Sequence, residues 1–145
     1  AAPDGVNLVV LDVVESEAVI RYTASTGQRM PIHVTAAGRA ILSQYSPSER
    51  ASVLKRIDYQ RHQNDAFMTA AAVEQDIQKS IKDGWFVNLG SYANDLAGIA
   101  VPFPFRNRRN AIVIGAPMSR VSERVDSLGK LLRGAVDRYL LENVT

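Results

Sequence analysis

Residues Gly27 to Leu42 read GQRMPIHVTAAGRAIL and join a turn, a short extended segment and the start of a helix. Ser25-Thr26-Gly27 predicts the turn, and the extended segment ends at Met30-Pro31. An apolar helical pattern then runs from Thr35 to Ser43. Its first turn, Ala36-Ala37-Gly38, carries almost no side chain, so its unpaired N–H groups are exposed. We therefore expect these amides to hold a carboxylate or another anion.

The composition describes one globular domain. The chain has 145 residues, an apolar fraction of 46% and a net charge of +2. No apolar run approaches the ~20 residues that a membrane span needs, and the N-terminal AAPDGVNLVV lacks the features of a secretory signal. We expect a cytoplasmic protein with no membrane partner. The absence of cysteine excludes disulfides, thiolate nucleophiles and cysteine-based metal sites.

Helical signals are concentrated in two places after the first helix. Ser46-Pro47-Ser48-Glu49 predicts a helix start, with a serine cap, a proline at the first position and a glutamate three residues after the cap. Thr69 is expected to cap a further helix that continues to about Lys82 and ends at Asp83-Gly84. Asp58 to Met68 is expected to be a loop. The residues expected to be buried on these helices are Val53, Leu54, Ile57, Val73, Ile77 and Ile81.

Strands are expected on both sides of these helices. Val6–Leu11 and Ala18–Tyr22 are expected to pair as an antiparallel hairpin. Further strands are expected at Trp85–Val87, Leu96–Phe105 and Ala111–Ala116, with a loop over residues 88–95. In the last strand the run Ile112-Val113-Ile114 indicates burial on both faces. The basic run Arg106–Arg109 lies between two of these strands, so we expect a solvated hairpin tip in preference to a phosphate-binding loop.

Near-helical spacing of apolar residues from Val121 to Leu140 predicts a C-terminal helix, in which Gly129 and Gly134 indicate close packing on a sheet. The predicted order is therefore ββαααβββα. This order indicates an α+β fold with one antiparallel β-sheet flanked by helices. No helix-turn-helix or zinc-finger pattern is present, so we expect no direct DNA contact from this chain.

Pro31, His33, Ala36, Gly38, Arg39 and Ala40 resemble the Pro-x-His-x-x-Ala-x-Gly-Lys-Ala signature of the effector-binding domain of IclR-type transcriptional regulators, with arginine in place of lysine. Three further segments resemble the same family in the same order: Lys82–Trp85, Leu96–Phe103 and Ala111–Arg120. The resemblance implies a GAF-like fold over residues 1–145, an effector pocket, and assembly into homodimers or homotetramers. It also implies that DNA is bound by an N-terminal winged helix-turn-helix domain, which this chain does not contain.

The resemblance also indicates where the pocket residues lie. Expected effector contacts are the backbone amides of Ala36, Ala37 and Gly38, a covering loop with Asn88 and Leu89, a floor of Gly98, Val113 and Gly115, and Met30 at the mouth. Val113 and Gly115 occupy positions where the family often has serine, and Gly98 a position that often has cysteine. Loss of these polar groups favours an aromatic or long-chain apolar carboxylate over a small oxo-acid.

Two alternatives of other classes remain open at this point. The pocket could be vestigial, filled by Met30, Leu89 and Trp85, in a module that serves oligomerisation. Less directly, His33 could serve a small hydrolase or isomerase, although its simpler role is to fix the strand-to-helix junction. No nucleophile, base and acid are placed together in sequence, so we expect no enzyme. No cofactor is expected, and His33 and His62 with no ligand-spaced carboxylate predict no metal site.

Overall fold

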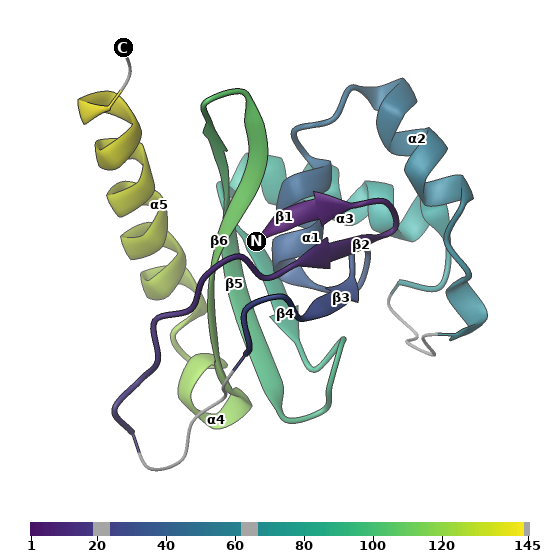
Figure 1. The fold of residues 1–145 in the computed structure, drawn as a ribbon. Coiled ribbons are helices and arrows are strands. Elements are labelled where there is room, and N and C mark those ends of the chain that lie inside the picture. The colour runs from purple at the N-terminus through teal and green to yellow at the C-terminus, as the bar shows by residue number, and fades with distance from the viewer. Residues whose placement is uncertain (19–23, 62–66, 144–145) are drawn as a thin grey trace.

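The computed structural model describes residues 1–18, 24–61 and 67–143. Its strands form two antiparallel sheets, each with three strands in sequence order. The strands are β1 (Ala2–Asp4), β2 (Asn7–Val9), β3 (Arg29–Pro31), β4 (Phe86–Leu89), β5 (Leu96–Phe105) and β6 (Arg108–Pro117). Ala1 and Ala111 exchange two hydrogen bonds of 3.0 Å, which join the two sheets beside β1 and β6 (Figure 1). The α+β class is confirmed, but the expected single sheet is divided into these two parts.

Helices cover both faces of the β4-β5-β6 sheet (Figure 1). On one face α1 packs against Ala100 and Ala111, and on the other α5 packs against Val101 through Leu132 and Val136. This division follows from the alternation of side chains along a strand. The helices are α1 (Ala36–Leu42), α2 (Pro47–Lys55), α3 (Ala70–Asp83), α4 (Met118–Val121) and α5 (Val125–Glu142), with a short 3-10 helix at Tyr59–Arg61.

The capping residues recognised in the sequence set the starts of three helices. Thr35, Ser46 and Thr69 each accept a hydrogen bond from the amide three residues later, at 3.1, 3.2 and 3.1 Å. At the end of α3, Gly84 adopts φ +96, the left-handed conformation that glycine enters at little cost. These local signals therefore place α1, α2 and α3 as predicted.

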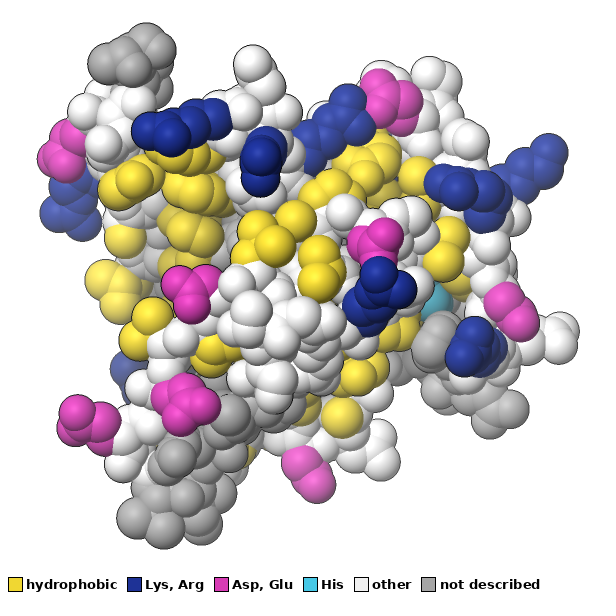
Figure 2. Space-filling model, in the orientation of Figure 1, with side chains coloured by type: hydrophobic (Ala, Val, Ile, Leu, Met, Phe, Trp, Pro, Cys, Tyr) yellow, Lys and Arg dark blue, Asp and Glu magenta, His cyan; other side chains and the backbone are white. Residues whose placement is uncertain are grey.

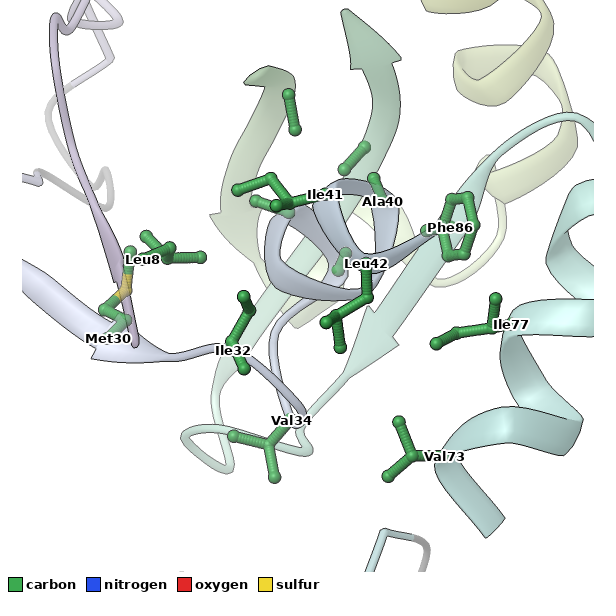
Figure 3. Close-up of a cluster of buried hydrophobic side chains, with 14 of the residues drawn as sticks. Leu8, Met30, Ile32, Val34, Ala40, Ile41, Leu42, Val73, Ile77 and Phe86 are labelled. Atoms are coloured by element: carbon green, nitrogen blue, oxygen red, sulfur yellow. The ribbon is translucent and has the colours of Figure 1, made fainter. Parts of the chain in front are cut away.

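The main apolar core surrounds α1, whose seven residues are all buried. Figure 3 shows Leu8 and Met30 from the first sheet on one side of this helix, and Phe86 and Ile77 on the other. A helix that is buried all round cannot rotate or shift without opening the core. The end of α1 that follows Thr35 is therefore held in a fixed position.

Several predicted details are wrong. Asn88 and Leu89 belong to strand β4, not to a loop, and the C-terminal helix is divided into α4 and α5. Ile81 is 50% exposed, because it lies on the solvent side of α3. The expected partner strand Ala18–Tyr22 falls largely outside the described residues, and β2 pairs with β1 and β3.

The predicted burial of β6 on both faces is also wrong. Ile112 is 38% exposed and Val113 is 41% exposed. At the other end of the strand, Arg106 and Asn107 form the expected exposed hairpin tip with φ values of +51 and +62. Of the two helical glycines, Gly129 packs against Trp85 as expected, whereas a Cβ at Gly134 would meet nothing within 4 Å. β6 is therefore an apolar strand whose side chains are partly exposed.

Candidate ligand-binding site

A cavity of about 470 Å³ adjoins β6 on the side that faces α1 and the segment after β2. In Figure 1 this segment leaves β2 and crosses in front of β6. The volume is in the range that small-molecule sites occupy. The cavity is lined mainly by apolar residues: Ala1, Val10, Leu11, Asp12, Val13, Val14, Ala24, Met30, Thr35, Ala36, Ala37, Asn88, Tyr92, Leu96, Ala97, Gly98, Phe103, Asn110, Ala111, Ile112, Val113 and Gly115.

Exposed large apolar side chains gather around this cavity. Half of those in the described part of the chain, Leu11, Val14, Tyr92, Ile112 and Val113, are lining residues. Val14 is the extreme case, with 97% of its surface exposed. Figure 2 shows apolar side chains on the same face of the molecule, over β6 and along α5. Gathered exposed apolar surface of this kind marks a binding site more often than chance.

The structure brings most of the predicted pocket residues together. The lining includes Met30, Ala36, Ala37, Asn88, Gly98, Val113 and Gly115. The small size of Gly98 has a clear consequence, because a Cβ there would lie 3.6 Å from Val113 and 3.8 Å from Ala36. Gly98 therefore leaves room between α1 and β6, where the cavity lies.

Two predicted pocket residues are placed elsewhere. The amide of Gly38 donates to Thr35 Oγ1 at 3.1 Å, so it is not available to an anion. Leu89 does not line the cavity, because neighbouring residues of a strand point to opposite sides and its neighbour Asn88 faces the cavity. Of the three amides expected to bind an anion, only those of Ala36 and Ala37 therefore remain available.

The polar groups of the cavity are backbone amides and the side chains of Asp12, Thr35, Asn88, Tyr92 and Asn110. No described residue accepts a hydrogen bond from the N–H of Ala36 or Ala37. Thr35 Oγ1 is already used, since it donates to the Pro31 carbonyl at 2.8 Å and accepts from Gly38. Asn88 Oδ1 accepts the amide of Ser91 at 2.7 Å and so holds the turn after β4. Asp12 is the one charged side chain of the lining, which has no cationic side chain.

Arg39 fixes the position of α1, which forms one wall of the cavity. Its side chain has no exposed surface, and its guanidinium donates to the Val87 carbonyl at 2.6 Å. Nε lies 3.3 Å from Asp76, and the guanidinium carbon lies 4.1 Å above the Phe67 ring. Burial lowers the pKa of Arg39 to about 10, while Asp76 opposes this change, so the group is charged at neutral pH. Arg39 thus ties α1 to α3 and to β4.

Neither His33 nor Trp85 belongs to the cavity. His33 is buried and meets Tyr59 edge to face, with ring centroids 5.3 Å apart. Trp85 packs on Gly129 of α5, on the other face of the sheet. The cavity is therefore not filled by Trp85 or Leu89, and His33 does not reach it. Within residues 1–18, 24–61 and 67–143 no three acidic or histidine side chains gather as a metal set, and His62 lies outside these ranges.

Comparison with known proteins identifies the family. The family described as "Bacterial transcriptional regulator IclR C-terminal" matches residues 1–139. This chain belongs to the IclR family. Its relatives include the acetate operon repressor of Salmonella typhimurium strain LT2, 28% identical over 92% of this chain and 50% of the relative. The transcriptional repressor IclR of Escherichia coli K12 is 26% identical over 94% of this chain and 54% of the relative. The chain thus spans about half the length of these relatives.

Solved structures confirm the fold of this IclR-family chain. The Thermotoga maritima IclR structure has a TM-score of 0.80 at 20% identity, covering 94% of this chain and 56% of that one. An IclR homolog from Microbacterium hydrocarbonoxydans, solved with 4-hydroxybenzoate, has a TM-score of 0.78 at 16% identity. The match covers 98% of this chain and 59% of that one. At these identities the likeness establishes the fold alone. No helix in the described ranges has the length and apolar character that crossing a membrane requires.

Residues 10–14 are the part of the cavity that sequence reasoning missed. The hairpin expected from Val6–Leu11 and Ala18–Tyr22 leaves residues 12–17 as a plain connection, whereas Val10 to Val14 form one wall of the cavity. The available signal was the run of apolar residues, which continues past the end of β2 through Leu11, Val13 and Val14. A surface connection normally has few apolar residues, so a run of them indicates that the segment covers another part of the protein.

Proposed function

We propose that this chain is the small-molecule-sensing regulatory domain of an IclR-type transcription regulator, and that its effector is an organic carboxylate with an aromatic or otherwise apolar body. The observation that carries the proposal is the cavity of about 470 Å³ beside Ala36, Ala37 and β6. A regulator that senses a metabolite needs such a site, and Ala36 of the family signature lies in its wall. The relatives named above are repressors, which fits a regulatory role without catalysis.

The chemistry of the lining supports the type of effector. The two unpaired amides at the start of α1 suit a carboxylate, and Val113 and Gly98 offer an apolar surface to the rest of the molecule. No cationic side chain contributes to the lining, so the apolar body would supply much of the affinity. The Microbacterium homolog of the same fold was solved with 4-hydroxybenzoate, an aromatic acid of this kind.

Regulation would then follow from differential binding. An effector shifts a regulator between two arrangements only if it binds one of them more tightly. In a homodimer or homotetramer of the whole regulator, that preference would reach DNA-binding domains outside this chain. The arrangement requires a cytoplasmic protein with access to DNA and to metabolites.

Thermal unfolding with a panel of acids tests the proposal. Benzoate, 4-hydroxybenzoate and octanoate are compared with glyoxylate and pyruvate, because a ligand of the folded state raises the Tm as its concentration rises. We expect the apolar acids to stabilise the chain more than the oxo-acids do. Tighter binding of glyoxylate or pyruvate would contradict the proposed effector class.

A matched pair of variants shows whether any shift comes from the cavity. Val113→Trp fills the cavity, and Ile81→Trp adds the same ring at a similarly exposed position on α3, away from it. We expect the ligand-dependent rise in Tm to disappear in Val113→Trp and to persist in Ile81→Trp. If no acid shifts the Tm, the rival function, a module that serves oligomerisation with an unused pocket, is favoured.

A further inference from the structure

The outer edge of β6 carries peptide groups that point away from β5. Phe105 and Arg108 close the hairpin around a two-residue turn, and the register continues one to one as far as Pro117. Antiparallel pairing alternates, so every second residue of β6 directs its N–H and C=O outward. Ala111 is one of these residues, because it exchanges two hydrogen bonds with Ala1. Because of this alternation, Val113 and Gly115 also direct their N–H and C=O groups away from β5.

These outward groups are unused. In the part of the chain that the structure describes, no hydrogen bond reaches the N–H or C=O of Val113 or Gly115. Both residues line the cavity, and both are exposed. An unpaired strand edge is a template for another extended group. Here the cavity volume of about 470 Å³ limits that group to a small molecule.

A simple apolar acid leaves this edge unsatisfied. When such a ligand covers Val113, the carbonyl of Val113 loses water and receives no donor in return. The loss of a hydrogen bond from a group that becomes buried weakens binding. A ligand that brings its own N–H donor avoids this penalty, and one that also brings a carbonyl or carboxylate oxygen satisfies an outward N–H of β6.

We propose that the effector is an N-acylated α-amino acid with an apolar side chain, bound as a one-residue extension of the sheet. Its amide N–H donates to the Val113 carbonyl, and one carboxylate oxygen accepts from the N–H of Val113, which leaves the other oxygen for the α1 amides of the proposed function. In an extended residue these two groups lie on the same edge, as they do in a strand. The apolar side chain then lies against the residues from Leu11 to Val14. This inference rests on the proposed function, because it requires the cavity to be an effector site.

Calorimetric titration of this chain with two matched ligands tests the inference. N-acetylphenylalanine and O-acetylphenyllactate differ in one group, the amide N–H that the ester replaces with oxygen. 3-Phenylpropionate serves as the plain apolar acid. We expect the amide to bind roughly tenfold more tightly than the ester, as one hydrogen bond to a covered carbonyl predicts.

Two variants locate the contact. Val113→Pro removes an N–H that points away from β5, a position where a strand tolerates proline, and we expect it to weaken both matched ligands. Val113→Ala keeps the N–H and the carbonyl, and we expect it to keep the amide-to-ester ratio. If Val113→Pro fails to fold, the inference is tested by the ratio of amide to ester affinity in the unmodified chain and in Val113→Ala.

The results separate this inference from the proposed function. Equal binding of amide and ester, together with binding of 3-phenylpropionate, overturns the inference and leaves the proposed function intact. No binding of any of the three acids overturns both. If the chain forms a dimer that Val113→Pro abolishes, the edge of β6 pairs with a second copy of the chain. That result would also overturn the inference.

Discussion

Gly38 of α1 lies so close to the Ile32 carbonyl that no Cβ fits between them. The neighbour is backbone, which cannot rotate away as a side chain can. Gly38→Ala is therefore expected to destabilise the chain by at least about 2 kcal/mol, although alanine favours helices. Urea unfolding measures this loss.

The control is Gly134→Ala in α5, where a Cβ would meet nothing within 4 Å. Here helix propensity acts alone, so the same substitution should stabilise the chain by up to about 1 kcal/mol. Opposite signs for the two substitutions are the expected result. A neutral Gly38→Ala would contradict the close packing of α1 on the segment before it.

Gly129 gives a second steric prediction, with a spectroscopic signal. A Cβ at this position would overlap the indole of Trp85, the one tryptophan of the chain. Gly129→Ala should cost about 1–3 kcal/mol, since the ring has to move away from α5. The emission maximum of Trp85 should shift as its surroundings change. An unchanged spectrum and unchanged stability would show that Trp85 packs elsewhere.

Arg39 and lysine should not be interchangeable, although lysine is usual at this position of the family signature. The guanidinium reaches the Val87 carbonyl and Asp76 together, and a single ammonium group cannot replace both contacts. We expect Arg39→Lys to lower the free energy of unfolding by about 1–3 kcal/mol. Arg29→Lys, in an exposed pair with Asp4, should change it by less than about 0.5 kcal/mol. Equal effects in urea unfolding would refute the anchoring role of Arg39.

Glu74 makes part of the stability depend on pH. Hydrogen bonds of 2.6 and 2.8 Å from the buried Arg50 lower the pKa of Glu74 from its ordinary value of 4.5. A carboxyl whose pKa is lower when folded stabilises the fold above its unfolded pKa, and this contribution is lost as pH falls through the folded pKa. Glu74→Gln should therefore be less stable than the parent chain at pH 7, with a difference that narrows below pH 4.5. A difference that stays constant from pH 7 to pH 3 would show no such linkage.

Local sequence signals predicted the parts of the fold that local physics decides. Thr35, Ser46 and Thr69 cap helices because each hydroxyl satisfies an amide in its own first turn. The hairpin of β5 and β6 follows from two apolar runs around a short polar turn. These features depend on neighbours within a few residues, so a single sequence contains them.

Features that depend on distant partners were missed or predicted wrongly. Ile112 and Val113 have the sequence of a doubly buried strand, yet they border a cavity. Nothing in their own segment shows that residues 10–14 pass nearby without filling the space. Gly38 was expected to offer its amide to a ligand, but the cap residue three positions earlier uses it. Seven of the nine expected pocket residues still line one cavity, because the resemblance to the family over several segments contains information on tertiary position that periodicity lacks.

The most direct measurement is a two-dimensional amide NMR titration of this chain with N-acetylphenylalanine and 4-hydroxybenzoate. It observes the N–H groups of Ala36, Ala37, Val113 and Gly115 individually. We expect saturable shifts at these four amides, with small changes at Gly38, whose N–H is already bonded to Thr35. Absence of shifts at these four positions, or shifts concentrated at another surface, would contradict the assignment of the cavity as the effector site.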